Sequence, residues 1–502
     1  MINLSKNIPV KILLSSKKLL ISKYGDKFSE VHNALVKLKE AHLKKEIKTL
    51  IVYLDDNSSV SITGIPSIAK IDSRSCKIYI DKIYKNMNPA YLALIGAQDI
   101  IPFCEFENPL FSPTGDTDNS IFSDLPYACD HSFSTEITDF VGPTRVISRI
   151  PDVHQNADVK YFTKVLSNAA QHKSIDAKNF KNYFAISVKL WKGSSQISTK
   201  NIFGENVKLL LSPPTTEKHS KTALKPLLHF YNCHGASFAP EFYGQVGKNY
   251  PVCQHSSSLV KKISMGTVVA AECCYGAQLY DNKTLGQPDK CICNTYLVEG
   301  AIGFMGSTNI AYGPADGQGL ADLICQFFLE KIKEGASQGR AFLEARQNFI
   351  KDSAEFDPYE LKTLHQFILL GDPSAVPCAV PQPKSINQSI ESRRSNLNSV
   401  GKVLQNITSV YKSIAKQTQN FNKKAIQEIL KEVNFTNVKV KKSFQLSSNN
   451  NNLQNAKTMP SLNSVFRVYV KSEQKQNINK ISALVVRENK DRVLSYKLYN
   501  SK

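Results

Sequence analysis

The sequence predicts an α/β protein built around a parallel sheet, followed by a small α+β domain. Short apolar runs of strand length alternate with segments whose apolar residues recur at helical spacing, which is typical of a parallel sheet covered on both faces. The last quarter of the chain differs from the rest in its charged residues. Residues 381–502 hold 22 Lys/Arg and 6 Asp/Glu, a net charge of +16, whereas residues 1–380 carry only +4.

The first α/β region covers residues 1–150. Apolar runs predict its strands, and the segment 104–145, rich in Asp, Ser and Pro, predicts a long loop of the kind that is often functional. We expect a strand and a basic turn in 9–22, a helix in 28–47, and strands at 49–54 and 91–96.

The second α/β region covers residues 151–380 and supplies the most regular pattern. We expect strands at 185–191, 207–211, 227–232, 266–271 and 300–306, and helices at 157–174, 256–264, 289–299, 317–334 and 336–351. Prolines between 377 and 383 mark its end, because they continue neither a helix nor a central strand.

The basic region 381–502 predicts a helix followed by strands. The expected elements are a helix in 399–433, strands at 438–446, 465–470, 480–486 and 492–499, a hairpin turn at 489–491 and an asparagine-rich loop at 449–452. Its charge suits an anionic partner such as nucleic acid or a membrane surface. The alternative is a solvated lysine face over an ordinary core.

Two neighbouring strand ends carry residues suited to nucleophilic chemistry. One presents His234 and Gly235, and the other presents Cys274, followed by Tyr275 and Gly276. Ligand sites form beyond the carboxyl ends of parallel strands, so the thiol and the imidazole should lie side by side. A thiol needs such a base to react near neutral pH. Backbone N–H groups of Gly235 and Cys274 are candidates for an oxyanion hole.

Buried cysteines are common in protein cores, so a structural role for this pair is the alternative. The glycines that follow, Gly235 after His234 and Gly276 two residues after Cys274, favour the catalytic interpretation.

The motifs resemble those of a known family. Residues 231–235 and 272–276 resemble the His-Gly and Ala-Cys-x-x-Gly motifs of the caspase-like clan of cysteine peptidases, and most closely its gingipain family. The segments 306–308 (Gly-Ser-Thr) and 370–374 (Leu-Gly-Asp-Pro-Ser) follow in the family's order, and 123–151 resembles the junction between its subdomains. The resemblance covers roughly residues 9–380.

This resemblance implies a caspase-like parallel-sheet sandwich of two subdomains, 1–150 and 151–380, plus the small α+β C-terminal domain 381–502. It implies a cysteine endopeptidase in which Cys274 attacks the scissile carbonyl and His234 activates the thiol or protonates the leaving amine. Protein or peptide substrates and limited proteolysis in a regulatory, defence or cell-death role follow. The alternative is an inactive scaffold that binds an anionic partner through its basic tail.

The sequence departs from the family pattern in two places. Two cysteines are adjacent, so Cys273 is the alternative nucleophile to Cys274. Some members orient the histidine with an acid, but 142–145 offers no carboxylate. That leaves a backbone carbonyl as the orienting group, or a weakened activity.

Substrate-binding and metal sites are less clearly marked. Members that cut after Arg or Lys use an acidic S1 residue, for which Asp316 and Asp281 are candidates, with ordinary turn aspartates as the alternative. We expect no cofactor and no metal. The pairs Cys291/Cys293 and Cys253/His255 lack zinc spacing. The loop acids Asp116, Asp118 and Asp124 lack the glycine and distal glutamate of a calcium loop.

Eleven cysteines, no recognisable signal peptide and no apolar run of membrane-spanning length predict a cytoplasmic protein with reduced thiols, and we expect a bacterial one.

Overall fold

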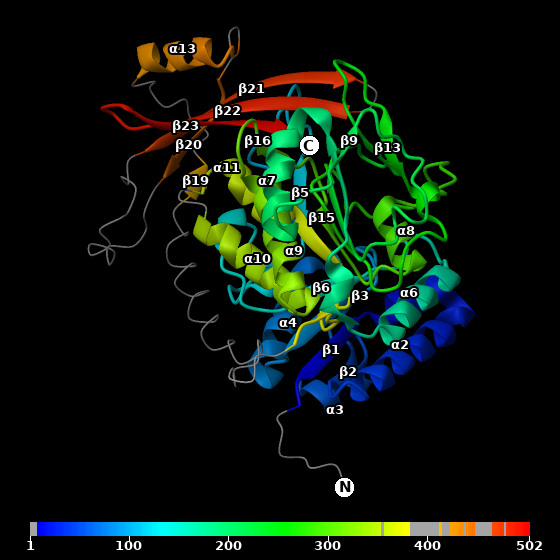
Figure 1. Ribbon diagram of the computed structural model, residues 1–502. Coiled ribbons are helices and arrows are strands. Elements are labelled where there is room, and N and C mark those ends of the chain that lie inside the picture. Colours follow the sequence, from blue (N-terminus) through cyan, green and yellow to red (C-terminus); the bar gives the residue numbers. More distant parts are fainter. Residues whose placement is uncertain are drawn as a thin grey trace.

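Ten strands form one sheet through the middle of the molecule (Figure 1). The computed structural model describes residues 8–352, 356–381, 411–413, 422–435, 438, 440–446, 464–475 and 478–502. In order across the sheet the strands are β2 (Lys48–Tyr53), β1 (Val10–Ser15), β3 (Tyr91–Ile95), β6 (Ile147–Ile150), β17 (Phe367–Gly371), β15 (Gly303–Ser307), β14 (Val268–Ala271), β10 (Leu228–Asn232), β8 (Phe184–Val188) and β9 (Leu210–Ser212). The α/β class that the sequence predicts is confirmed.

The two halves of this sheet end at the same edge. Strands β2, β1, β3 and β6 are parallel, as are β15, β14, β10, β8 and β9. Strand β17 runs antiparallel to β15. Lys11, at the start of β1, bonds Asp372 just after β17, so the starts of β1 and β15 lie at one edge. The carboxyl ends of both halves therefore meet at the opposite edge.

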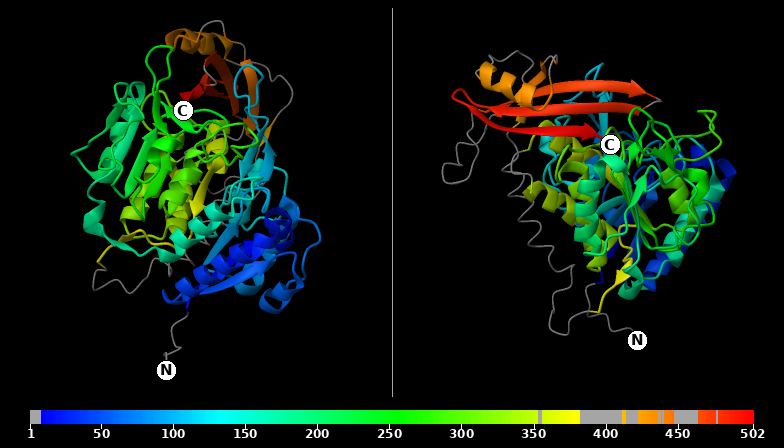
Figure 2. Two further views of the ribbon diagram at one scale, coloured as in Figure 1. Left: turned by 90° about the vertical axis from the view of Figure 1, so that its right-hand side faces the viewer. Right: turned by 45° about the horizontal axis from the view of Figure 1, so that its top comes forward.

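Helices cover both faces of the sheet, as Figures 1 and 2 show. One layer contains α2 (Phe28–Leu43), α6 (Val159–Gln171) and α8 (Ile292–Glu299), which contact one another in a row. The other contains α7 (Lys192–Phe203), α9 (Leu320–Lys333) and α10 (Gln338–Asp352). The remaining helices of this region are α1 (Lys17–Tyr24), α3 (Val60–Thr63), α4 (Ser73–Met87), α5 (Leu125–Ala128) and α11 (Pro358–Gln366).

Small additional sheets lie outside the ten-stranded sheet. They pair β4 (Cys104–Glu107) with β5 (Ser120–Ser123), β7 (Ile175–Asp176) with β18 (Cys378–Ala379), and β11 (His234–Gly235), β12 (Glu241–Tyr243) and β13 (Val252–His255) in order.

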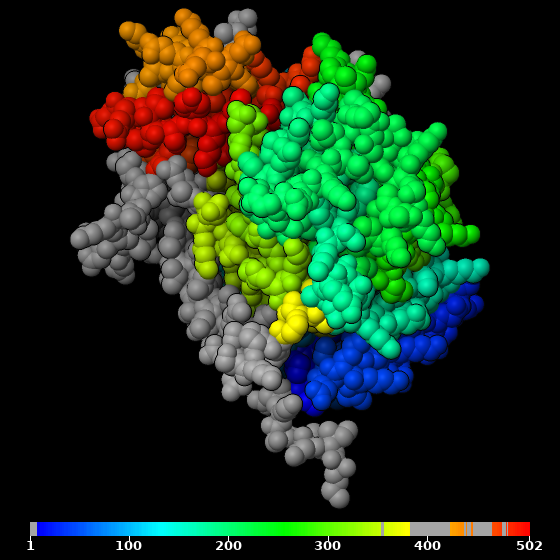
Figure 3. All heavy atoms as spheres, viewed as in Figure 1, coloured from blue at the N-terminus to red at the C-terminus, as the bar shows by residue number. Residues whose placement is uncertain are grey.

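The described strands of the basic region form a second sheet, which also includes one strand from the body of the molecule, residues 1–380. Its order is β16 (Tyr312–Pro314), β23 (Val493–Ser501), β22 (Ile478–Glu488), β21 (Val465–Lys475), β20 (Val440–Leu446) and β19 (Tyr411–Ser413), with α13 (Lys423–Glu432) packed on one face. Its apolar side chains join the core of the body. Figure 3 shows its last strands, in red, lying against the body. The predicted α+β character is confirmed.

Several sequence expectations are corrected. The basic turn expected after β1 is helix α1, which Ser16 caps by accepting from Leu19 N. The helix expected at 256–264 is only a 3-10 turn, Ser256–Leu259. The helix expected at 399–433 is only partly correct: residues 423–432 form α13, but residues 411–413 form strand β19 instead. Residues 399–410 and 414–421 and the asparagine-rich loop lie outside the described residues. The boundaries at 150 and 380 stay predictions. Among the described residues, no helix combines the length and apolarity needed to span a membrane.

A buried ionic cluster ties the two sheet halves together at the edge away from the carboxyl ends. Asp372 forms an ion pair with Lys11. Its carboxylate also accepts hydrogen bonds from His42 Nε2 at 2.7 Å and from Ser374 Oγ at 2.8 Å. Burial alone would raise the pKa of Asp372, but Lys11 and His42 outweigh it and hold that pKa well below its usual range.

Asp372→Asn should lower the free energy of unfolding by about 3 kcal/mol at neutral pH, because Lys11 stays buried without its counter-charge. The depressed pKa means that the stabilisation is present above the unfolded pKa of about 4 and is lost as pH falls below it. Urea titrations should therefore show the gap to wild type closing in acid. Ser374→Ala, which keeps the ion pair, is the milder control. Equal stability of wild type and Asp372→Asn at pH 7 would contradict this role.

Candidate active site

The parallel pairing of β10 with β14 sets the two catalytic candidates side by side. Tyr231 lies in register with Ala271, so His234 and Cys274 each come three residues beyond the same level. Gly235 sits directly against the second strand end, where a Cβ would lie 1.9 Å from the Cys274 carbonyl oxygen. Only glycine fits there. The predicted neighbourhood of the two strand ends is confirmed.

The adjacent cysteines face different environments. Cys273 is fully buried, and burial and the equally buried Cys233 raise the pKa of its thiol well above the ordinary value. Cys274 Sγ accepts from Ala311 N at 3.3 Å and donates to the carbonyl oxygen of Lys502. Burial raises the pKa of Cys274 to about 12, so its thiol is neutral here. The geometry favours Cys274 over Cys273 as the nucleophile.

His234 is held by an amide rather than by an acid. Its Nε2 lies 2.9 Å from Gln245 Oε1. An amide oxygen only accepts, so Nε2 carries the hydrogen and Nδ1 keeps a free lone pair. Nδ1 makes no hydrogen bond within the described residues. Burial, together with the nearby cations of Lys502 and Lys480, lowers the pKa of His234 to about 4, although the hydrogen bond to Gln245 opposes this shift.

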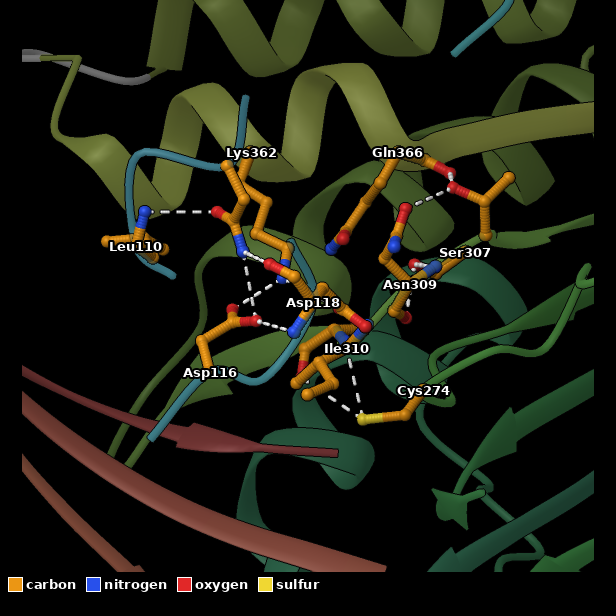
Figure 4. Close-up of polar contacts among 12 residues, drawn as sticks. Leu110, Asp116, Asp118, Cys274, Ser307, Asn309, Ile310, Lys362 and Gln366 are labelled. Atoms are coloured by element: carbon orange, nitrogen blue, oxygen red, sulfur yellow. Dashed lines mark hydrogen bonds and ion pairs between the residues drawn. The ribbon is translucent and has the colours of Figure 1, made fainter. Parts of the chain in front are cut away.

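A buried ion cluster fixes the backbone on both sides of Cys274 (Figure 4). Lys362 Nζ bonds Asp116 and lies 3.1 Å from Asp118 Oδ2. Asp118 in turn accepts from Ile310 N at 2.8 Å and from the Tyr275 hydroxyl at 2.7 Å. The segments before Ala311 and after Cys274 are thereby tied to one carboxylate.

The same contacts account for the loop acids considered as calcium ligands. Lys362 forms ion pairs with both Asp116 and Asp118, and Arg149 pairs with Asp124 at 2.6 Å. Across the part of the chain that the structure describes, no group of three or more His, Cys, Asp or Glu side chains is placed to hold a metal ion.

A pocket beside the dyad holds the side chain of Lys502. Its ammonium lies 3.0 Å from Asp322 Oδ1, in the first turn of α9, and 4.4 Å from the ring centroid of Trp191, at the end of the 3-10 turn Lys189–Trp191. The wall opposite is Gly313, where a Cβ would lie 2.1 Å from Lys502 Cε. Asn232 Nδ2 donates to Asp322 Oδ1 at 3.2 Å and orients it. Trp191 also contacts His234, with ring centroids 4.5 Å apart.

A second carboxyl group lies behind Asp322. Glu272 is fully buried, and burial together with the charge of Asp322 raises its pKa well above the ordinary value. Two adjacent buried carboxyls do not both ionise. Burial and Asp322 thus favour the neutral form of Glu272, and Asp322 is the carboxyl that contacts the ammonium.

The two acids proposed for S1 from the sequence lie elsewhere. Asp281 accepts from Lys283 N and Thr284 N, both at 3.1 Å, and from Asn156 Nδ2 at 2.9 Å, as a turn aspartate does. Asp316 is exposed. The structure brings Asp322 to the lysine instead. The oxyanion role of the Gly235 and Cys274 N–H groups stays a prediction.

A buried cysteine and a histidine thus lie at neighbouring strand ends, beside the buried ammonium of Lys502. Residues 15–377 match the family model of Peptidase family C25. The match covers well over half of the chain, so the protein belongs to this family and is a cysteine peptidase. The family membership predicted from the motifs is confirmed.

Comparison with solved structures finds one described as "Structure of Protease". It is 13% identical, and the alignment covers 99% of this chain and 98% of that one with a TM-score of 0.48. No curated protein matches the sequence.

Gln245→Glu should raise the pKa of His234 above about 4 by at least ~1 unit, because a carboxylate against Nε2 stabilises the imidazolium. Gln245→Ala, which removes the acceptor and adds no charge, should not raise it. NMR titration of ¹³C-labelled histidine, with His234→Gln to assign the signal, measures both. Identical titration of the two variants would exclude Gln245 as the orienting group.

Proposed function

We propose that the protein is an endopeptidase that cleaves peptide bonds after lysine, with Cys274 as nucleophile and His234 as acid–base group. One observation carries the proposal. Lys502 places its ammonium in the Asp322 pocket while its carbonyl oxygen contacts the Cys274 thiol. A substrate whose P1 lysine filled this pocket would present its scissile carbonyl to the same sulfur.

The resting protonation states indicate how the reaction starts. A thiol with a pKa of about 12 and an imidazole with a pKa of about 4 are both neutral, so no thiolate–imidazolium pair exists with the cleft filled. As Sγ adds to the carbonyl carbon, His234 Nδ1 takes the thiol proton and passes it to the leaving amine. Water then hydrolyses the thioester and restores the thiol. We assign the oxyanion to the N–H groups of Gly235 and Cys274.

The pocket is suited to lysine by charge and by shape. Asp322 supplies one carboxylate, and Trp191 supplies an aromatic face for the cation. An apolar P1 side chain would leave Asp322 buried without a counter-charge, which is strongly unfavourable. Gly313 leaves room for the lysine stem that any larger residue would fill.

Limited proteolysis of protein substrates, in a regulatory or defensive role in the cytoplasm, completes the proposal. The inactive-scaffold alternative is less well supported. Two lysines of the basic region, Lys497 and Lys502, pair with carboxylates of the same chain rather than facing an external anion.

Asp322→Asn should reduce kcat/KM for a lysine substrate about 100-fold, because a buried ammonium without its counter-charge costs about 3 kcal/mol. Glu272→Gln should stay within ~5-fold of its parent, since a neutral amide replaces a neutral acid. Hydrolysis of fluorogenic peptides with lysine or leucine at P1 measures both effects. The parent chain carries Lys502→Ala to empty the pocket.

Cys274→Ala in the same chain should abolish hydrolysis, whereas Cys273→Ala should retain it. Equal losses from Asp322→Asn and Glu272→Gln, or faster cleavage after leucine than after lysine, would refute the proposed specificity.

A further inference from the structure

The last strand of the chain lies in the active-site cleft in the manner of an extended peptide. Strand β23 pairs antiparallel with β16, with Ser501 opposite Tyr312 and Tyr499 opposite Pro314. Backbone bonds prolong the ladder at both ends, from Lys502 N to Ala311 O and from Ala315 N to the carbonyl of residue 498, each 2.9 Å. Addition of a strand to an exposed edge is a common way to bind peptides, with alternate side chains read by pockets.

A second side chain of this strand is held in a pocket of the body. Tyr499, three residues before Lys502, is 3% exposed. Its hydroxyl donates to Asp357 Oδ2 at 2.6 Å, and its ring lies 5.1 Å from that of Tyr359. Asp357 is the N-cap of α11, where it accepts from Glu360 N through its other oxygen. The Tyr499 hydroxyl is thus held by the capped N-terminus of α11.

A third contact lies two residues further back along the strand. Lys497 Nζ lies 2.9 Å from Glu360 Oε1, in the first turn of α11. Lys497, Tyr499 and Lys502 therefore each meet an acidic group of the body, at Glu360, Asp357 and Asp322. Figures 1 and 2 show the end of the chain lying among the strands and helices of the body.

We propose that the cleft beside β16 recognises an extended peptide with lysine at P1, tyrosine at P4 and a basic residue at P6, and that residues 497–502 are its resident occupant. The chain then inhibits its own active site until this strand is displaced. The inference rests on the proposed function, which assigns Lys502 to P1, and it adds Asp357, Tyr359 and Glu360 as specificity-determining residues.

The attachment of the occupant to the same molecule makes it an effective competitor. A tethered segment reaches its site at an effective concentration on the order of millimolar, whatever the protein concentration. Strand β23 is also paired along its length with β22, and Ser501 Oγ accepts from Ile481 N at 2.8 Å. A free substrate must therefore compete with a preordered strand, and loosening of the basic region would expose the cleft.

Binding of the peptide Lys-Leu-Tyr-Asn-Ser-Lys, labelled with a fluorophore, tests the inference without catalysis. It is titrated into three full-length chains: Cys274→Ala, Cys274→Ala with Lys502→Ala, and the latter with Tyr499→Phe added. Variant peptides with alanine for tyrosine, or glutamine for the last lysine, are the controls. Emission of Trp191, the single tryptophan of the chain, gives a second readout, because the lysine ammonium lies over its ring.

The inference predicts a dissociation constant at least ~10-fold lower once Lys502→Ala is present, with a further decrease on adding Tyr499→Phe. Both control peptides should bind more weakly. Equal binding to all three chains, or binding to none of them, would overturn it.

Comparing this titration with hydrolysis by the same variants, with Cys274 intact, separates this inference from the proposed function. If chains with Lys502→Ala bound the peptide more tightly yet, with Cys274 intact, failed to hydrolyse lysine substrates, the proposed activity would fail and the resident occupant would stand. If wild type and Lys502→Ala hydrolysed lysine substrates equally well, the endopeptidase would stand and the self-inhibition would fail.

Discussion

The parallel pairing of β10 with β14 is the constraint on which the whole site depends. One strand end supplies Asn232 and His234, and the other supplies Glu272 and Cys274. His234 and Cys274 are the proposed reacting pair, and Asn232 and Glu272 lie next to Asp322 in the proposed lysine pocket. The proposed chemistry and specificity thus depend on a single register. A slip of one residue would turn these side chains to the opposite faces of the sheet.

Burial sets the electrostatics of this edge. It raises the pKa of the Cys274 thiol and of the Glu272 carboxyl and lowers that of the His234 imidazole, which favours the neutral form of all three, and Asp322 is the carboxyl that contacts the Lys502 ammonium. A single buried carboxylate opposite a single ammonium is a selective arrangement, because a wrong partner leaves a charge unpaired. The separate cluster of Lys362, Asp116 and Asp118 holds the backbone near Cys274 through Ile310 and Tyr275.

Sequence reasoning could place His234 and Cys274 at neighbouring strand ends because strand ends, glycines and family motifs are all local features. It could not find the pocket. Asp322 lies in the first turn of a helix, where acids are common because they stabilise helices there, and so the sequence favoured the loop acids Asp281 and Asp316 instead. Gln245 was missed because an amide was not expected where an acid commonly serves. The pairing of β16 with β23 joins segments far apart in sequence, and the spacing of apolar residues along the chain does not predict such a contact.

The central claim is that a lysine side chain in the Asp322 pocket delivers the adjoining carbonyl to Cys274. The most direct measurement is covalent labelling of the Lys502→Ala chain with peptidyl chloromethyl ketones that carry lysine or leucine at P1, followed by mass spectrometry of the modified peptide. The account predicts rapid modification by the lysine reagent at Cys274 alone. Modification at Cys273, or equally fast modification by the leucine reagent, would contradict it.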